Sequence, residues 1–217
     1  MIELIVKGGL SYLVGSILGS LVVSRLTGGV DIRTRGSGNA GATNALRTLG
    51  KKAALAVLLI DLAKGWIATG VVATWAMPAG VTAASAALAA WSAPVCGIAV
   101  MLGHVYPLWF GFRGGKGVAT LLGAVLGINA WLLLPMTLTW LVAVIAFGYV
   151  GLASILGAFA LAVAIALTRS GPPLLAFGIL AALLILYTHR SNLARMRAGT
   201  ESRARRLWLF GTRRGPA

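Results

Sequence analysis

Long apolar stretches constrain the fold of this chain more than any other feature of its sequence. Five segments of about 20 residues carry few charges and run over roughly 4–23, 53–75, 81–103, 149–168 and 172–188. A helix needs about 20 mainly apolar residues to cross the ~30 Å hydrocarbon core of a bilayer, which offers the backbone no hydrogen-bond partner. Because 59% of the 217 residues are apolar, one water-soluble core cannot bury them all. The sequence predicts an all-α integral membrane protein.

The stretch 118–148 sets the expected number of helices. It is too long for one ordinary span and short for two, and Asn129 and Pro135 near its middle favour two short helices joined by a turn. With this division the chain has about seven transmembrane helices. We expect a single domain over 1–217 that ends in a basic cytoplasmic tail from about residue 203.

Basic residues predict the orientation of these helices. Lys and Arg collect in short cytoplasmic loops, and here they cluster in 24–52, in 104–117 and after residue 189. All three clusters lie on one side of the membrane only if an even number of helices separates the second cluster from the third, and the division of 118–148 supplies four. We therefore expect the N-terminus outside and the C-terminus in the cytoplasm.

The net charge has three ordinary explanations. The chain has 19 Lys and Arg residues but only 4 Asp and Glu residues, which gives +15. Nucleic-acid contact, attraction to anionic lipid and cytoplasmic anchoring of loops all produce such an excess. The basic residues adjoin the apolar segments and do not form a soluble face with interleaved aromatic residues, so we expect membrane lipid and no nucleic acid as a partner.

No pattern typical of a metal site occurs. The single cysteine, Cys96, lies in an apolar run, and no Cys/His cluster has zinc spacing. We expect neither a metal nor a cofactor. In the first apolar stretch Glu3 precedes Lys7, and no small-residue cleavage site follows, so we expect a retained helix and no signal peptide.

Residues 35–47 are unlike the helices beside them, because glycine alternates with small polar residues. Glycine permits positive φ and a close approach of the backbone to a ligand, so consecutive N–H groups can bind an anion. Hydroxyl and amide groups add neutral donors, and an arginine provides a planar fork that suits phosphate oxygens. A flexible loop with a helix N-cap is the alternative. The candidate residues are Ser37, Gly38, Asn39, Gly41, Thr43, Asn44 and Arg47.

The loop 103–120 repeats this chemistry before another apolar segment. Its Gly-Gly-Lys-Gly turn resembles a phosphate cradle, but the Walker A spacing and the strand before it are absent, so nucleotide hydrolysis is not supported. Aromatic residues in the loop either line an acyl-chain entrance or are ordinary interface anchors. The candidate residues are His104, Gly114, Gly115, Lys116 and Gly117, with Lys116 as the expected charge partner.

A third polar segment begins where the last apolar stretch ends. If this segment is helical, His189 and Asn192 share a face, because side chains three residues apart are neighbours. Arg195 and Glu201 follow them and add a cation and an acid. A histidine at a helix end is also a common cap.

Few polar side chains lie within the apolar segments, where ionisable groups usually mark a site or a path. Asp61 and Lys64 are three residues apart and are spaced to form an ion pair that orients a helix or supports the first loop. Ser154 lies near the predicted cytoplasmic end of its helix and is a weaker candidate contact, because such hydroxyls often only bond the preceding turn.

Together the three polar segments resemble the bacterial acyl-phosphate-dependent glycerol-3-phosphate acyltransferases. The first motif matches Gly36-Ser37-Gly38-Asn39-Ala40-Gly41-Ala42-Thr43-Asn44-Ala45-Leu46-Arg47. The second matches His104 to Gly117, and the third matches His189, Asn192, Arg195, Gly199 and Glu201. One such motif would be weak, but three in the family's order, each at a helix boundary, are specific.

The resemblance implies transfer of a fatty acyl group from a long-chain acyl phosphate to the 1-hydroxyl of sn-glycerol 3-phosphate, giving lysophosphatidate and inorganic phosphate at the cytoplasmic side of a bacterial plasma or inner membrane. It implies a catalytic group of Ser37, Arg47, Lys116, His189 and Asn192, and it makes the other candidates substrate contacts. No obligate protein partner is implied. Since an acyl phosphate is already activated, Ser37 is expected to bind substrate and not to attack it.

The base that removes the hydroxyl proton is left open between His189 and a substrate phosphate oxygen, and we favour the phosphate oxygen. Two other classes of protein stay under consideration. A transporter for a phosphorylated anion would also place cations at helix ends, but it commonly shows repeated halves with helices broken near the midplane. An acyltransferase that uses acyl-CoA or acyl carrier protein as donor is not separated from this prediction by the physics of the sequence.

Overall fold

A computed structural model describes residues 1–78, 85–204 and 208, and within them it contains helices and no strand. The main helices are α1 (Ile2–Gly15), α2 (Gly19–Leu26), α3 (Ala42–Thr48), α4 (Lys51–Trp66), α5 (Ala86–Ala89), α6 (Ser92–Val105), α7 (Val118–Ile128), α8 (Leu133–Phe147), α9 (Val150–Leu167), α10 (Pro172–Thr188) and α11 (Arg190–Arg197). A π-helical turn, η2 (Ile67–Val72), extends α4, and short 3-10 turns are η1 (Ile32–Thr34), η3 (Leu108–Phe110) and η4 (Ala130–Leu132).

Five helical segments in the described part of the chain are long and apolar enough to cross a membrane. They are Ile2–Leu26, Lys51–Val72, Ala86–Phe110, Ala130–Phe147 and Val150–Leu167. A sixth is added if α10 and α11, which meet at an angle of 49°, count as one span. The all-α membrane architecture is therefore confirmed, whereas seven spans and their orientation stay predictions. The third apolar segment was expected from residue 81, and its start falls in 79–84, outside the described residues.

The stretch 118–148 is divided into two helices, α7 and α8. The break falls at Asn129, whose side-chain Oδ1 accepts a hydrogen bond from the backbone N of Trp131 at 3.0 Å. Pro135 lies in the first turn of α8, where its missing N–H costs little. α7 has 11 residues, so at about 1.5 Å per residue it is roughly half as long as the ~30 Å hydrocarbon core.

The first apolar stretch is also divided, which periodicity did not predict. α1 ends at Gly15 and α2 begins at Gly19, with Ser16, Ile17 and Leu18 between them. The carbonyl oxygens of Gly15 and Ile17 accept hydrogen bonds from Lys64 Nζ of α4, at 3.0 and 2.9 Å. A lysine from another helix thus takes the place of backbone partners where the helix is interrupted.

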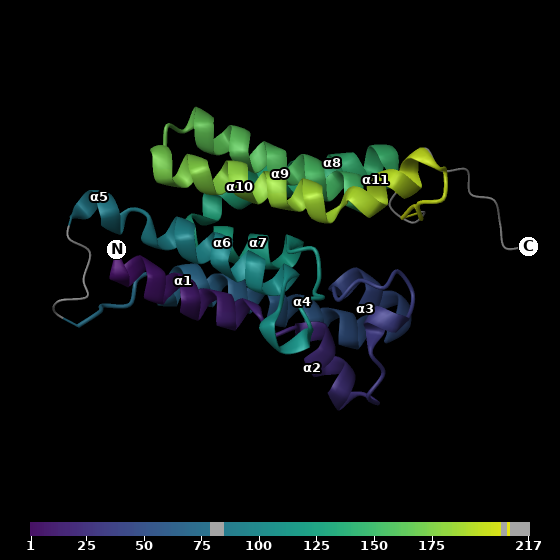
Figure 1. Ribbon diagram of the computed structural model, residues 1–217. Coiled ribbons are helices and arrows are strands. Elements are labelled where there is room, and N and C mark those ends of the chain that lie inside the picture. Colours follow the sequence, from purple (N-terminus) through teal and green to yellow (C-terminus); the bar gives the residue numbers. More distant parts are fainter. Residues whose placement is uncertain (79–84, 205–207, 209–217) are drawn as a thin grey trace, which may run out of the picture.

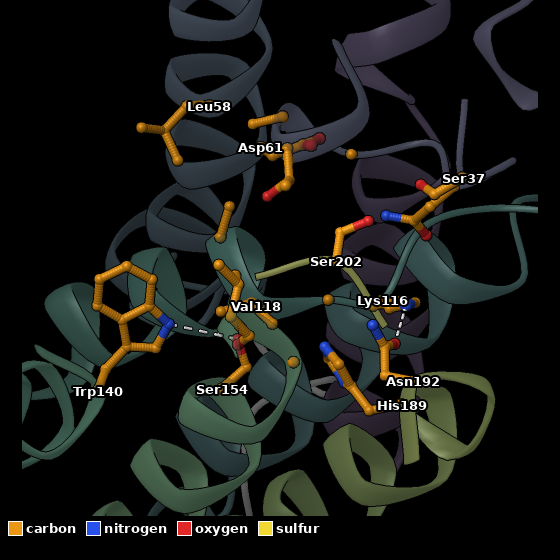
Figure 2. A pocket seen from close by; sticks show the side chains of 18 of the residues that line it. Ser37, Leu58, Asp61, Lys116, Val118, Trp140, Ser154, His189, Asn192 and Ser202 are labelled. Atoms are coloured by element: carbon orange, nitrogen blue, oxygen red, sulfur yellow. Dashed lines mark hydrogen bonds between the residues drawn. The ribbon is translucent and has the colours of Figure 1, made fainter. Parts of the chain in front are cut away.

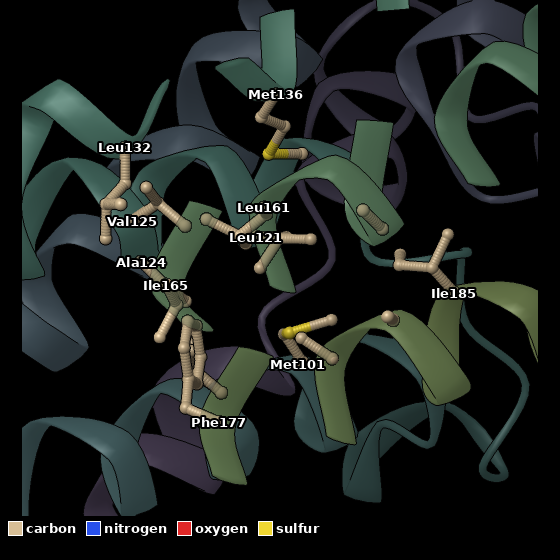
Figure 3. Packing of buried hydrophobic residues seen from close by; sticks show 14 of the residues in the cluster. Met101, Leu121, Ala124, Val125, Leu132, Met136, Leu161, Ile165, Phe177 and Ile185 are labelled. Carbon is tan, nitrogen blue, oxygen red and sulfur yellow. The ribbon is translucent and has the colours of Figure 1, made fainter. Parts of the chain in front are cut away.

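The helices form two groups that lie side by side (Figure 1). One group contains α8, α9, α10 and α11, and the other contains α1, α4, α6 and α7, with contacts between α10 and α6. Met1 and α5 lie at one end of the molecule, and α3 and α11 lie at the other. The apolar core between the groups includes Met101, Leu121, Ile165, Phe177 and Ile185, all almost fully buried (Figure 3).

Glycines allow the closest helix contacts. A β-carbon on Gly123 of α7 would lie 1.9 Å from the carbonyl oxygen of Leu62 in α4. A β-carbon on Gly103 of α6 would lie 2.1 Å from the carbonyl oxygen of Tyr12 in α1. Both distances are far below van der Waals contact, so only glycine permits these backbones to approach as they do, in the manner of small-residue interfaces in membranes.

Candidate active site

The three polar segments meet around one cavity of about 760 Å³ at the end of the molecule near α3 and α11. Ser37 faces this cavity from the first loop, Lys116 from the second, and His189 and Asn192 from the junction of α10 and α11 (Figure 2). The convergence that charge placement predicted is therefore present in the structure, independently of which side of the membrane it faces.

The first loop is held in shape by Asn44, which is fully buried. Its Nδ2 donates to the carbonyl oxygens of Ile32 and Arg35 at 2.8 and 3.0 Å, and its Oδ1 accepts from the backbone N of Ser37 at 2.9 Å. Gly36 has φ +59°, and a β-carbon there would lie 2.3 Å from Asn44 Oδ1. Asn44 thus presents Ser37 to the cavity but does not line it.

Arg33 joins the first loop to the second. Its guanidinium donates to the carbonyl oxygens of Phe110 and Arg113 at 3.0 and 2.9 Å. Asp31 accepts from the other side of the guanidinium, with Oδ2 2.8 Å from Arg33 Nη2. The neighbouring Arg33 holds the pKa of the Asp31 carboxyl below its usual range. The bidentate pair therefore fixes the arginine that connects the loops.

The second loop brings Lys116 into the cavity through two glycines. Gly114 N donates to Val105 O at 3.0 Å, and Gly115 N donates to His104 O at 3.1 Å. A β-carbon on Gly115 would lie 2.2 Å from His104 Nε2, so the loop lies directly against that imidazole. Lys116 follows immediately, and its Nζ donates to Oδ1 of Asn192.

Burial lowers the pKa of Lys116 to about 8. The positive charges of Arg195 and Arg47 act in the same direction, whereas Glu201 opposes them. A lysine in this range is charged at neutral pH and loses its charge within a slightly basic range.

Asn192 links the second loop to the segment after α11. Its Nδ2 donates to Glu201 Oε1 at 2.7 Å, and Glu201 Oε2 pairs with Arg195 Nε at 2.6 Å. Lys116, Asn192, Glu201 and Arg195 thus form one hydrogen-bonded chain along the wall of the cavity. Glu201 orients two of its neighbours, as a charge-assisted pair does.

His189 follows the last residue of α10 and is 4% exposed. Its Nδ1 lies 2.8 Å from the carbonyl oxygen of Ile185, so Nδ1 carries the proton and donates. The free lone pair is then on Nε2. Burial, aided by the nearby Lys116 charge, lowers the pKa of His189 to about 4. The side chain is a neutral hydrogen-bond acceptor at physiological pH.

A second part of the cavity is apolar. Leu58 of α4, Leu122 of α7, Met136 and Trp140 of α8, and Val150 of α9 line it. Ser154 Oγ donates to Val150 O at 2.9 Å, and Trp140 Nε1 lies 3.4 Å from the same hydroxyl (Figure 2). Thr137 of α8 is another lining residue, and its side chain is exposed.

Most of the residues singled out from the sequence line the cavity. They are Ser37, Asn39, Gly41, Thr43, Arg47, His104, Lys116, Gly117, Ser154, His189, Asn192, Arg195 and Glu201. Gly38, Asn44, Gly114 and Gly115 lie outside the lining and shape the two loops. Ser202 and Trp140 line the cavity without having been predicted, because no local motif marks them. In the described ranges, no group of three or more His, Cys, Asp or Glu side chains is placed to hold a metal ion.

Comparison with known proteins identifies the family. A family model described as glycerol-3-phosphate acyltransferase matches residues 5–199. This chain belongs to the glycerol-3-phosphate acyltransferase family. Named relatives of the same description include a protein of Albidiferax ferrireducens, 42% identical over 199 residues that cover 89% of this chain and 86% of that protein. A relative from Bordetella pertussis is 44% identical over 202 residues, covering 89% of this chain and 88% of the relative.

Two crystal structures of PlsY (YgiH), an integral membrane glycerol 3-phosphate acyltransferase, have the same fold. The glycerol 3-phosphate form superposes with a TM-score of 0.82 at 36% identity and covers 96% of each chain. The lysophosphatidic acid form has a TM-score of 0.80 at 35% identity, covering 92% of this chain and 94% of that one. The family resemblance inferred from the three motifs is confirmed, and the chain is a multi-pass membrane protein of this acyltransferase family.

Proposed function

We propose that this protein transfers a fatty acyl group from a long-chain acyl phosphate to the 1-hydroxyl of sn-glycerol 3-phosphate, giving 1-acyl-sn-glycerol 3-phosphate and inorganic phosphate. The observation that carries the proposal is a single cavity with a cationic end and an apolar arm. The cationic end suits phosphate groups and the apolar arm suits an acyl chain. The related PlsY structures, described as a glycerol 3-phosphate form and a lysophosphatidic acid form, support the acceptor and the product.

The cationic end suits two phosphate-bearing substrates at once. Arg47, Lys116 and Arg195 line it, and Glu201 is paired with Arg195. α7 begins at Val118, two residues after Lys116, with Gly117 as its N-cap. Gly117, Val118 and Ala119 line the cavity, so the free N–H groups of the first turn of α7 add positive potential there. These groups offset the repulsion between two anions and hold the acceptor hydroxyl near the acyl carbon.

The reaction needs no covalent intermediate on the protein. The oxygen of the 1-hydroxyl attacks the acyl carbon, the bond from that carbon to the phosphate oxygen breaks, and the phosphate leaves with the electron pair. The hydroxyl proton passes to a phosphate oxygen. Phosphate is a good leaving group, so Ser37 serves to bind substrate from its exposed position on the first loop.

His189 suits substrate positioning better than proton removal. Its pKa of about 4 makes it a weak base, and general bases work best with a pKa near the operating pH. The neutral ring presents Nε2 as an acceptor, while Nδ1 is held by Ile185 O. We assign His189 to accept a hydrogen bond from a glycerol hydroxyl, and Asn192 to hold Lys116 and the acceptor.

The site lies on the cytoplasmic side of the bacterial inner membrane in this proposal. Basic loops adjoin it, and such loops stay in the cytoplasm. We place the entry of the acyl chain from the bilayer beside Thr137 of α8, which lines the apolar arm and is exposed.

The donor assignment is tested with protein purified in detergent. Glycerol 3-phosphate is supplied with palmitoyl phosphate in one reaction and with palmitoyl-CoA in another, and lysophosphatidate and phosphate are measured. We expect product with palmitoyl phosphate, with one phosphate released per acyl group transferred. Product with palmitoyl-CoA alone would overturn the donor and leave the acceptor in place.

A further inference from the structure

A buried polar cluster lies beside the active site, and the proposed reaction leaves it without a role. Asp61, Lys64 and His104 are 1%, 4% and 3% exposed. Lys64 Nζ lies 3.0 Å from Asp61 Oδ1 and 2.7 Å from His104 Nδ1. Asp61 and His104 also line the cavity (Figure 2 shows Asp61). Burying charges in a membrane protein is costly, so their arrangement calls for a function.

Lys64 Nζ lies within 3.0 Å of four acceptors. They are the carbonyl oxygens of Gly15 and Ile17 at the break between α1 and α2, Nδ1 of His104 and Oδ1 of Asp61. The Asp61 carboxylate neutralises the ammonium group. Nδ1 of His104 thus faces the Lys64 ammonium at 2.7 Å and the Asp61 carboxylate at 3.5 Å. Lys64 and Asp61 together hold the orientation of the imidazole, and Lys64 ties it to the end of α1.

His104 in turn supports the second loop (103–120), the glycine-rich loop that carries Lys116. Its Nε2 edge lies against Gly115, where a β-carbon would be only 2.2 Å away, and its carbonyl oxygen accepts from Gly115 N at 3.1 Å. The end of α1 holds the same loop from the other side. Tyr12 OH donates to Tyr106 O at 2.7 Å, and Ser16 Oγ accepts from Leu108 N at 3.2 Å.

We propose that the buried Asp61–Lys64–His104 cluster positions Lys116 by holding His104 against Gly115. The cluster acts on catalysis through this loop and does not touch the reacting atoms. Lys116 enters the cavity one residue after the contact, so a displaced imidazole lets the loop move and leaves Lys116 closer to water. The inference deepens the proposed function, because it treats Lys116 as the phosphate-binding group of that reaction.

The chain contains a matched control. Glu3 and Lys7 of α1 form a second buried pair, 2.6 Å apart, and Lys7 Nζ also donates to a backbone carbonyl, that of Ala73, at 2.8 Å. Neither residue lines the cavity. Lys7→Met removes the same chemistry as Lys64→Met but leaves the glycine-rich loop untouched.

The experiment measures the titration of Lys116 without turnover. Purified wild-type, Lys64→Met and Lys7→Met proteins are acetylated with trace acetic anhydride between about pH 6.5 and 11, a range that brackets a depressed and an ordinary lysine pKa. Peptide mass spectrometry quantifies the labelling of Lys116, with the exposed Lys51 and Lys52 as internal standards. In Lys64→Met we expect the pKa of Lys116 to rise from about 8 by about one unit or more, because the ammonium becomes better hydrated. In Lys7→Met we expect no change.

A folded Lys64→Met protein with an unchanged Lys116 titration would overturn the proposal, as would an equal shift in Lys7→Met. If Lys64→Met does not fold, His104→Ala gives the test, since it keeps the Asp61–Lys64 pair and removes only the ring against Gly115. The same rise in Lys116 pKa is expected. Failure of both variants to fold would overturn the positioning role, because the cluster would then support the fold as a whole. The activity of the wild-type protein with palmitoyl phosphate is measured in a separate assay. A wrong donor assignment would show in that assay, whereas a wrong role for the cluster would show only in the titration of Lys116.

Discussion

We expect the protonation of a single residue, Lys116, to make the activity depend on pH. Its pKa of about 8 means that its positive charge is present below this pH and lost above it. We therefore expect kcat/KM for glycerol 3-phosphate to fall as pH rises through about 8, because the deprotonated amine no longer attracts phosphate. A pH–rate profile measures this. In Lys116→Arg, whose guanidinium stays charged, the residual activity should show no such decline, and a decline of the same shape would assign the titration to another group.

The charge itself is tested by Lys116→Met. The substitution removes the donor to Asn192 and one of the three cations that line the cavity. We expect turnover to fall by about 10²-fold or more, the usual effect of removing a preorganised donor to developing charge. Lys51→Met, at an exposed position outside the cavity, is the control and should stay within about two-fold of wild type. Equal losses in both variants would contradict the site described above.

His189→Gln separates positioning from proton removal. Glutamine keeps a hydrogen-bonding side chain but cannot act as a general base. If a phosphate oxygen takes the proton, the variant should show a raised KM for glycerol 3-phosphate and a measurable kcat at saturation. Steady-state kinetics at several acceptor concentrations measures both constants. A variant that binds the acceptor but has no turnover would make His189 the base.

At the scale of elements, the contact between α4 and α7 depends on glycine. Gly123→Ala places a β-carbon 1.9 Å from Leu62 O, which belongs to a rigid helix backbone. We expect the two helices to separate and the protein to lose about 1–3 kcal/mol of stability, as overpacked interiors do. Thermal unfolding in detergent measures the loss. Gly9→Ala in α1 is the matched control, because nothing lies within 4 Å of the added carbon. The midpoint of its thermal unfolding should not fall below that of the wild type.

The sequence predicted the elements where the pattern is local. Apolar length located α9 and α10 almost to the residue, and Asn129 marked the break between α7 and α8. The interruption of α1 was not predicted, since Ser16, Ile17 and Leu18 are compatible with a continuous helix. What makes the break tolerable is Lys64, a residue from another helix. Such a tertiary contact leaves no periodic signal near residue 16.

In the site, too, local motifs were predicted from the sequence and tertiary contacts were not. Residues inside the three motifs were found from glycine density and charge, and Asp61 and Lys64 form the ion pair that their spacing predicted. Arg33 lies in the basic cluster predicted over 24–52 but was not singled out there, although it cross-links two loops. Its partners are carbonyl oxygens of Phe110 and Arg113, and backbone acceptors are present at every position. No residue pattern therefore identifies them before the chain is folded.

The tail after Glu201 shows another limit of local patterns. Arg203 lies 4.6 Å from the ring centre of Tyr149 and 4.0 Å from that of Trp208. Trp208 Nε1 also donates to Ala146 O at 3.2 Å. One arginine of the predicted basic tail thus contacts the turn between α8 and α9. The tail residues Arg205, Arg206, Arg213 and Arg214 lie outside the described residues.

At the scale of the whole molecule, the loops around the cavity and Met1 lie at opposite ends of the bundle. We expect the loop end in the cytoplasm. Cysteine introduced as Lys51→Cys in a Cys96→Ser background should react with a membrane-impermeant maleimide only after the cells are permeabilised. Cys96 is the one cysteine of the chain, so its replacement leaves the introduced thiol as the sole labelling site. Labelling of intact cells would reverse the predicted orientation and place the loop end outside the cytoplasm.

In the proposed reaction, an acyl chain that enters the apolar arm beside Thr137 comes from the bilayer, so the enzyme works between two phases. Glycerol 3-phosphate dissolves in water, so its supply follows bulk concentration. The acyl donor partitions into the bilayer, so its supply follows its mole fraction among the surrounding lipids. Adding inert lipid vesicles or detergent at fixed total donor should therefore slow the reaction by surface dilution, with no change in the aqueous composition. In a cell, the rate of acylation would then depend on the mole fraction of acyl donor in the membrane. Growth of the bilayer would lower that mole fraction and so slow the reaction.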